Sequence, residues 1–309
     1  MDWSQVESVA TTLLDGNPIA IFLALAVALA LPAILHWALY RKAASPSLST
    51  FVLLGPSGAG KTAFLTLRSK AAPITHTSQA STSTTVTLPP SVPIFSNRYR
   101  SVNDSSLSDS KRNPVQYILK DTPGHGKLRS AQISQLQTDL SSKKEASPTR
   151  GIVFFVDAAS LSEEAESLRD SASYLYDVLL VLQKVVLNKG KSSSKAGTTV
   201  PLLVASNKQD LFTALPPGSV RQKLESEIDR IRKTRQKGLM DASAGSELNE
   251  DEDEILGGDD GRESFSFQAL EDDIGIKVEV IGGFTKAEDG DADGGAGVRK
   301  WEEWIGKRL

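Results

Sequence analysis

A glycine-rich turn directly after an apolar run constrains the fold of this chain more than any other feature. Residues 55–62 read G-P-S-G-A-G-K-T, and the four residues before them, 51–54, are all apolar. This order of strand, turn and helix matches the G-x-x-x-x-G-K-[ST] phosphate loop, in which glycines let successive N–H groups point at phosphates. The predicted phosphate-binding residues are Gly55, Pro56, Ser57, Gly58, Ala59, Gly60, Lys61 and Thr62.

Two residues of this loop have predicted roles of their own. Lys61 would reach the β- and γ-phosphates of a nucleotide, and the hydroxyl of Thr62 would bind Mg²⁺. The helix that begins near Lys61 would add the partial positive charge of its N-terminus. The loop therefore predicts a nucleotide site in an α/β fold, without specifying which nucleotide.

An uncharged segment near the N-terminus predicts a membrane span. Residues 19–40 contain no Asp, Glu, Lys or Arg, and a helix of that length spans roughly 33 Å, enough for a hydrocarbon core of about 30 Å. A cleaved signal peptide fits less well, because the residues ahead of the segment are acidic and include no Lys or Arg. Since Arg41 and Lys42 follow the segment, the positive-inside rule places the chain after it in the cytosol. We expect a short segment 1–18, a transmembrane helix 19–40 and a juxtamembrane linker 41–49.

Composition excludes several kinds of site. The chain has no cysteine, which rules out disulfides, thiolate metal ligands and cysteine nucleophiles. Its three histidines stand far apart in the sequence, so we expect no histidine-rich metal site. The formal net charge of -3 gives no strong basic field, and we expect no direct nucleic-acid binding.

Strand and helix signals alternate after the linker, which predicts one α/β domain, 50–309, with a mostly parallel sheet. The expected strands are 51–54, 93–99, 115–120, 151–157, 200–206 and 276–281, and the expected helices are 61–70, 161–188, 218–236 and 297–307. Polar insertions near 101–113, 141–149, 189–199 and 238–263 are interpreted as surface loops. The acidic run 247–254 lacks the spacing and glycine of a calcium loop, so we interpret it as solvated chain.

The motif D-T-P-G-H at 121–125 follows the predicted strand 115–120. In a parallel sheet the carboxyl end of a strand beside the phosphate strand faces the nucleotide. Asp121 could then hold Mg²⁺ through water, and the Gly124 N–H could contact the γ-phosphate. Taken alone, the segment fits a plain Pro-Gly turn equally well.

The motif S-N-K-Q-D at 206–210 ends another predicted strand and indicates guanine. A carboxylate at Asp210 would accept hydrogen bonds from the N1–H and the 2-amino group of guanine, and adenine offers no such pair of donors. Asn207 would tie neighbouring loops together, and the stem of Lys208 would cover the base. The three motifs occur in the order that a single site requires, so we predict that the chain binds GTP or GDP with Mg²⁺.

With these motifs the chain resembles the Ras-like superfamily of GTPases over about residues 50–309. Together with the N-terminal segment it is similar to the beta subunits of signal recognition particle receptors. The narrower resemblance rests on D-T-P-G-H-G-K-L-R at 121–129, S-N-K-Q-D at 206–210, the long insert before F-S-F-Q-A-L at 265–270, K-V-E-V at 277–280 and W-E-E-W at 301–304. An Arf-like trafficking GTPase is the alternative, but Met1-Asp2 lacks the glycine that N-myristoylation needs.

The resemblance implies a Ras-like G domain with a six-stranded, mostly parallel sheet. It also implies a switch anchored in the endoplasmic reticulum membrane that binds the receptor's alpha subunit during co-translational protein targeting, with the ribosome or the translocon as further candidate partners. GTP and Mg²⁺ would order the segments 75–90 and 122–132. One rival is a constitutive membrane anchor with structural GTP. A second is an unrelated membrane ATPase or kinase, which the N-K-Q-D motif disfavours.

The resemblance also assigns roles to four further positions. The Ser/Thr-rich stretch 82–87 would hold the switch threonine that binds Mg²⁺, with Thr84 as our choice and Thr85 as the alternative. His125 stands where many members have the Gln that orients the attacking water, and Ser57 stands where fast members have Gly. Both substitutions imply slow intrinsic hydrolysis, which a supplied arginine accelerates by about 10³–10⁵-fold in such enzymes. G-G-F-T-K at 282–286 replaces the usual S-A-K, so Thr285 is expected to contact the base in a weaker or shifted way.

Overall fold

The computed structural model describes residues 18, 22, 25–32, 34, 48–69, 78–89, 91–94, 115–141, 149–192, 200–243, 255–257, 264–286 and 295–309. The chain divides into two compact units, Met1–Ser47 and Leu48–Leu309.

In the N-terminal unit, residues 25–32 are helical and their side chains are exposed, including Leu25, Leu29 and Leu31. Most of the remaining predicted span 19–40 lies outside the described residues. Among the residues that are described, no helix is both long enough and apolar enough to cross a membrane. The transmembrane helix therefore stays a prediction.

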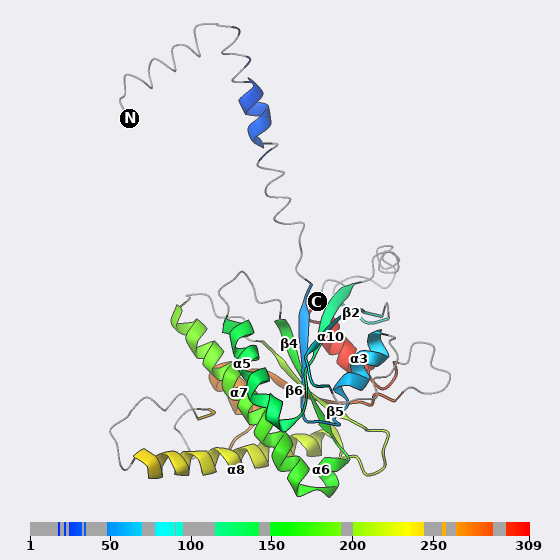
Figure 1. Ribbon diagram of the computed structural model, residues 1–309, viewed down its shortest axis with the longest axis vertical. Coiled ribbons are helices and arrows are strands. Elements are labelled where there is room, and N and C mark those ends of the chain that lie inside the picture. The colour runs from blue at the N-terminus through cyan, green and yellow to red at the C-terminus, as the bar shows by residue number, and fades with distance from the viewer. Residues whose placement is uncertain are drawn as a thin grey trace. The chain divides into compact units, whose positions relative to one another are not determined.

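The second unit is built on one six-stranded sheet with the order β2-β3-β1-β4-β5-β6 (Figure 1). Its strands are β1 (Thr50–Leu54), β2 (Thr82–Thr87), β3 (Gln116–Asp121), β4 (Thr149–Asp157), β5 (Leu202–Asn207) and β6 (Val278–Gly282). Only the β2–β3 pair is antiparallel, and every other neighbouring pair is parallel. The predicted six-stranded, mostly parallel sheet is thus confirmed.

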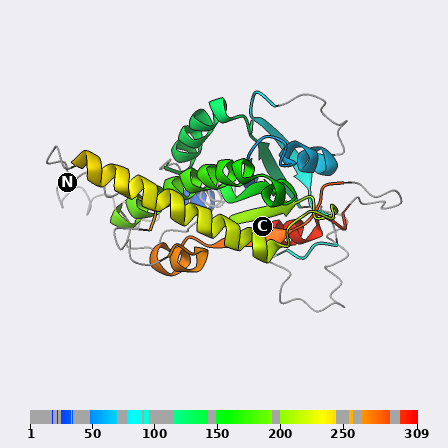
Figure 2. The same ribbon diagram turned by 90° about the horizontal axis from the view of Figure 1, so that it is seen from below.

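Helices cover both faces of this sheet (Figures 1 and 2). On one side lie α3 (Lys61–Ser69) and α10 (Arg299–Gly306), and on the other lie α5 (Gly126–Ser141), α7 (Ala165–Ser192), α8 (Pro217–Ser243) and α9 (Phe267–Ile274). A short helix, α6 (Ser160–Glu163), precedes α7. Coverage of both faces explains why the central strands are continuous apolar runs.

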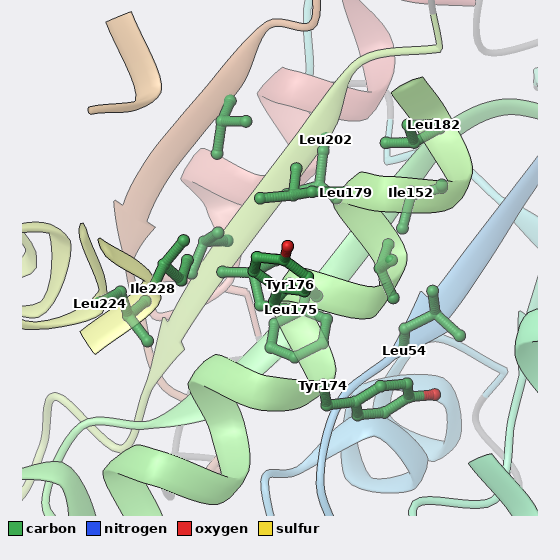
Figure 3. Close-up of a cluster of buried hydrophobic side chains, with 14 of the residues drawn as sticks. Leu54, Ile152, Tyr174, Leu175, Tyr176, Leu179, Leu182, Leu202, Leu224 and Ile228 are labelled. Atoms are coloured by element: carbon green, nitrogen blue, oxygen red, sulfur yellow. The ribbon is translucent and has the colours of Figure 1, made fainter. Parts of the chain in front are cut away.

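Alternation along each strand divides the core into two hydrophobic clusters. In β4, for example, Ile152 and Phe154 belong to the larger cluster with α7 and α8, whereas Val153 and Phe155 belong to the smaller one with α3 and α10. Figure 3 shows part of the larger cluster, in which side chains from α7 meet residues of β1, β4, β5 and α8. Both clusters pack against the same central strands and fix the sheet from its two sides.

The second strand differs from the sequence prediction. The sequence places it at 93–99, but β2 is Thr82–Thr87, residues 93 and 94 are not in a strand, and 95–99 lie outside the described residues. The physical reason is that 82–87 is dominated by Thr and Val, whose branched side chains favour strands. Pairing with β3 outweighs the polar, loop-like composition.

Two helices had weak sequence signals. In α5 only Leu136 and Leu140 are buried, so its apolar periodicity is faint. In α9 the apolar face is short, but both ends are capped: Ser266 Oγ accepts a hydrogen bond from the Ala269 N–H, and Gly275 takes a left-handed conformation with φ +80°. Local caps and tertiary packing define these helices more than hydrophobic periodicity does.

A buried ion pair joins α3 to α10 on the face of the sheet that these two helices cover. Arg68 Nε lies 3.0 Å from Glu302 Oε1, and the two side chains are only 6% and 2% exposed. Because both charges have lost most of their water, each depends on the other for compensation.

Replacing Arg68 with Met should remove the positive charge beside the buried Glu302 carboxylate and lower the free energy of unfolding by about 3–5 kcal/mol. Urea denaturation would measure the loss. The matched control is Arg299→Met, which breaks the largely exposed pair with Glu303 and should cost less than about 1 kcal/mol. Equal losses in the two variants would contradict the burial of the Arg68–Glu302 pair.

Candidate nucleotide-binding site

The phosphate loop leaves β1 through glycines that no other residue could replace without strain. Gly55 and Gly60 have φ +133° and +103°, in the region that favours glycine. A Cβ on Gly55 would lie 2.3 Å from the carbonyl oxygen of Phe155, and one on Gly60 would lie 2.0 Å from Asn207 Nδ2. The loop is therefore held by β4 on one side and by the end of β5 on the other.

Lys61 is buried at the start of α3 and curls back over the loop. Its Nζ donates hydrogen bonds to the carbonyl oxygens of Gly55 and Pro56, both at 2.8 Å. Burial lowers the pKa of Lys61 to about 8, since the attraction of Asp121 only partly offsets the lost hydration and Arg129 lowers the pKa further. This ammonium is a cation with little solvation of its own, which suits it to bind a phosphate.

Gly124 packs directly against this lysine. A Cβ at Gly124 would lie 2.6 Å from Lys61 Nζ and 2.7 Å from the Ser57 nitrogen. The close approach requires glycine, and it places the predicted γ-phosphate contact beside the predicted phosphate lysine. The fold thus brings the phosphate loop 55–62 and the D-T-P-G-H motif 121–125 into contact.

A cluster of oxygen atoms lies beside the loop. Thr62 Oγ1 donates to Asp121 Oδ2 at 2.6 Å, and Ser78 Oγ lies 3.2 Å from Thr62 Oγ1 and 3.5 Å from Asp121 Oδ2. Asp121 Oδ1 is buried and makes no hydrogen bond within the described part of the chain. Burial raises the pKa of Asp121 above its ordinary value, against the opposing effects of the Thr62 hydrogen bond and the Lys61 charge.

This donor set fits Mg²⁺, which prefers oxygen ligands and keeps several of them as water or phosphate. The described residues contain no group of three or more His, Cys, Asp or Glu that could hold a metal. Thr62 and Asp121 would therefore need ligands from elsewhere, such as a nucleotide phosphate. The unpaired Asp121 oxygen is the feature that a cation or a bound water would satisfy.

The structure does not bring Thr84 to this cluster. In β2 the partner of Asp121 is Thr82, whereas Thr84 pairs with Leu119 and Thr85 with Ile118. Both predicted switch threonines therefore pair with β3 residues that precede Asp121 by two or three positions, and neither lies opposite Asp121. Ser78, which the sequence analysis passed over, contacts Thr62 and Asp121 instead.

His125 is exposed at the turn into α5, where its Nδ1 accepts a hydrogen bond from the Lys127 N–H at 3.3 Å. It lines a cavity of about 490 Å³ beside the phosphate loop. Arg129 lines the same cavity; its guanidinium holds Asp170 of α7 through two hydrogen bonds of 2.6 and 2.5 Å and lies 4.7 Å from the centre of the Tyr174 ring. The sequence shows Arg129 as part of a motif but does not predict this ion pair, because Asp170 lies 41 residues away in the chain.

At the other end of the site, Asn207 connects two loops. Its Nδ2 donates to the Ala59 carbonyl oxygen at 2.8 Å and lies 3.5 Å from Thr285 Oγ1. Its Oδ1 is buried and makes no hydrogen bond within the described residues. Asn207 thus joins the phosphate loop to the loop after β6.

Lys208 and Asp210 follow at the end of β5. Lys208 has a left-handed backbone, φ +63°, and its Nζ lies 2.5 Å from Asp157 Oδ2. Burial alone would raise the pKa of Asp157, but the hydrogen bonds from Lys208 and Ser160 hold that pKa below its ordinary value. Asp210 itself is exposed.

Asp157 is a site residue that the sequence analysis missed, although a signal was available. It ends the apolar strand β4, just as Asp121 ends β3 and Asn207 ends β5. In the parallel register Leu53 lies opposite Asp121, and Asp157 lies opposite Asn207. The polar residues at these strand ends therefore share one edge of the sheet, where α/β folds bind ligands.

The sheet, the phosphate loop after β1 and the N-K-Q-D segment after β5 define a Ras-like G domain. The family model described as "Signal recognition particle receptor beta subunit" matches residues 46–274. The chain belongs to this family, the signal recognition particle receptor beta subunits.

Similar proteins agree with this placement. The beta subunit from Saccharomyces cerevisiae is 28% identical over 274 residues, which cover 87% of this chain and 86% of the relative. A solved "SRb-GTP/SRX complex" from Chaetomium thermophilum has a chain that is 32% identical, with a TM-score of 0.57 and coverage of 86% of this chain and 100% of that chain. A solved "SRb-GDP-Mg" structure from the same organism is 33% identical, with a TM-score of 0.56 and coverage of 85% and 98%.

The lowered pKa of Lys61 predicts how stability depends on pH without nucleotide. The folded protein loses the Lys61 proton near pH 8, whereas the unfolded chain keeps it up to the ordinary value of 10.5. Because the unfolded state then binds more protons, the free energy of unfolding should gain a contribution that rises from pH 8 to 9.5 by at most about 1.4 kcal/mol per pH unit. Chemical denaturation of the nucleotide-free chain at each pH would measure it.

The control for this experiment is Lys61→Met, which keeps much of the side-chain volume and has no proton to lose. Its free energy of unfolding should lack the additional rise, so the difference between the two proteins should change across this pH range. Parallel pH profiles would show that Lys61 keeps its ordinary pKa in the folded state.

Proposed function

We propose that this chain is the membrane-anchored, GTP-binding subunit of a signal recognition particle receptor and joins the receptor's alpha subunit in a GTP-dependent way. The observation that carries the proposal is the bridge made by Asn207. One side chain holds both the phosphate loop and the loop of Thr285, and three residues further on Asp210 presents its carboxylate to solvent. This bridge supports the proposal that the residues for the phosphates and the residue for the guanine base belong to one site.

Each end of GTP has an assigned set of residues in this proposal. The backbone N–H groups of 55–60, together with Lys61, hold the phosphates. Asp210 accepts the two guanine donors, with Thr285 on the neighbouring loop. The ion pair between Lys208 and Asp157 supports a role for the Lys208 stem in covering the base.

Thr62 and Asp121 hold Mg²⁺, which neutralises charge on the β- and γ-phosphates when bound. We assign the third oxygen of this site to Ser78 or a neighbouring residue in place of Thr84, because Ser78 is the hydroxyl near both ligands. Gly124 lies against Lys61, so a γ-phosphate reaching Lys61 would also meet the Gly124 N–H. Gly124 would therefore link the γ-phosphate to the segment 122–132, one of the two segments that GTP is proposed to order.

Hydrolysis is expected to be slow without a partner. His125 is exposed on the wall of the cavity beside the phosphate loop, and its Nδ1 accepts a hydrogen bond from the backbone of α5, so we infer that a partner is needed to orient the imidazole toward the attacking water. Within the described residues the guanidinium on the cavity wall belongs to Arg129, and Asp170 neutralises it. We expect the GTP-bound state to be long-lived, and an activating partner to complete GTP hydrolysis.

The partner and the membrane complete the proposal. A related chain has been solved as an SRb-GTP/SRX complex, which supports a GTP-dependent contact with the alpha subunit. We assign residues 19–40 to a single span of the endoplasmic reticulum membrane, 1–18 to its lumenal side, 41–49 to a linker and 50–309 to the cytosolic G domain. The ribosome or the translocon would then be within reach of this domain.

Replacing Asp210 with Asn should remove the acceptor for both guanine donors. We expect GTP affinity to fall by about 10- to 100-fold and the preference for GTP over ATP to be largely lost. Competition of both nucleotides against a fluorescent GDP analogue would measure this. The control, Asp273→Asn, makes the same charge change at an exposed position of α9 and should leave affinity and preference unchanged. An unaltered base preference in the Asp210 variant would refute the guanine assignment.

The switch itself can be tested against the constitutive anchor with structural GTP. We expect the amino-terminal domain of the alpha subunit to bind at least about tenfold more tightly to the chain loaded with a non-hydrolysable GTP analogue than to the GDP form. The reason is that the γ-phosphate, which GDP lacks, favours the ordered conformation of segments 75–90 and 122–132. Titration calorimetry on both forms would measure the two affinities. Equal values would favour the constitutive anchor.

A further inference from the structure

Three residues of the long insert are anchored on the helical face of the G domain. Ile255, Leu256 and Gly257 are described, while the insert residues on either side, 244–254 and 258–263, lie outside the described part of the chain. Ile255 is 7% exposed and Leu256 is fully buried, and Leu256 belongs to the larger hydrophobic cluster with Leu179 and Ile228. The insert 238–263, which the sequence predicts to be a surface loop, therefore contains two buried apolar side chains.

Side chains of α7 recognise the backbone of this segment. The Gln183 side chain, itself 3% exposed, donates from Nε2 to the Ile255 carbonyl oxygen at 2.9 Å and accepts from the Gly257 N–H at Oε1, also at 2.9 Å. The Leu256 N–H donates to the Tyr176 hydroxyl at 3.3 Å. One primary amide thus pairs with a backbone donor and a backbone acceptor, as a neighbouring strand would.

The third position selects for glycine. Gly257 has φ +81°, a conformation that other residues rarely adopt, and a Cβ there would lie 3.6 Å from Arg232 Nη1 of α8. The anchor site, defined as Tyr176, Gln183 and Arg232, therefore fits the sequence apolar–Leu–Gly in a turn that ends on a left-handed glycine. Specificity comes from the Leu side chain and the glycine backbone, and the hydrogen bonds come from the main chain.

The energetics indicate a reversible contact. The gains are the burial of Ile255 and Leu256 and three hydrogen bonds, and the cost is the conformational entropy of three ordered residues. These contributions are of similar size, so the balance is small compared with that of a core strand such as β5. The segment belongs to no helix or strand whose cooperativity would hold it in place.

We propose that the anchor site is a peptide-binding site for apolar–Leu–Gly sequences, which the chain's own Ile255–Gly257 occupies reversibly as an intramolecular ligand. When this segment leaves, the site accepts a peptide of the same chemistry from another protein. The site is separate from nucleotide binding, since Gln183 follows Asp170 by 13 residues, or about 20 Å along α7. The inference does not depend on the function proposed for the G domain.

The direct test uses the full chain and a fluorescein-labelled peptide with the sequence of residues 250–260. Leu256→Asp in the chain should vacate the site, and fluorescence anisotropy should then show binding at least tenfold tighter than to the wild-type chain, where the tethered segment competes. A peptide carrying the same Leu→Asp change should not bind. Adding Gln183→Ala to the Leu256→Asp chain should weaken binding at least tenfold, whereas adding the exposed control Gln268→Ala should not. A cooperative urea-unfolding transition in each variant would show that it is folded.

A second measurement needs no substitution. Hydrogen exchange of the wild-type chain should show the Leu256 and Gly257 amides exchanging at least 10³-fold faster than amides of β5, and excess unlabelled peptide should accelerate them further. Exchange as slow as that of β5 would overturn the proposal by making the segment a permanent part of the core. Peptide binding that ignores Gln183 or the peptide's Leu would also overturn it.

Discussion

Parallel hydrogen bonding on both sides of β1 is the constraint on which the rest of this domain depends. With β3 on one side and β4 on the other, the phosphate loop that leaves β1 must emerge between the ends of both strands. Because β5 continues the parallel order, Asp121, Asp157 and Asn207 all end at the same edge. The site is therefore a consequence of strand direction, and each loop needs only to place one or two side chains.

This arrangement carries an electrostatic cost that a ligand can relieve. Lys61 has lost much of its hydration and relies on backbone carbonyls and on Asp121, whose own pKa is raised by burial. A protein selected only for stability would not bury such a lysine, since its burial favours the neutral form. A nucleotide with its metal would supply charges of both signs at once, and binding would then stabilise the fold by mass action. The same residues link function to stability.

The helix α7 connects several regions that are distant in sequence. Near its start Asp170 and Tyr174 hold Arg129 of the segment that follows the D-T-P-G-H motif at 121–125. Further along, Tyr176 and Gln183 hold the insert, and Asp177 pairs with Arg235 of α8. A long helix packed against the sheet (Figure 3) can serve both regions because buried residues along its length, among them Tyr174, Tyr176 and Gln183, also carry polar groups or aromatic faces that contact distant segments.

The sequence by itself determined five of the six strands, the phosphate loop and the motifs at the strand ends, because apolar runs and glycine turns are local signals of local geometry. It did not locate β2, whose Thr-rich residues look like a loop until β3 pairs with them, or α5, whose buried face consists of Leu136 and Leu140. Only the tertiary structure decided that Ser78 lies beside Thr62 and Asp121 while Thr84 does not, and that Asp170, Gln183 and Leu256 have partners far away in the chain. These contacts depend on strand register and helix packing, which no short stretch of sequence encodes.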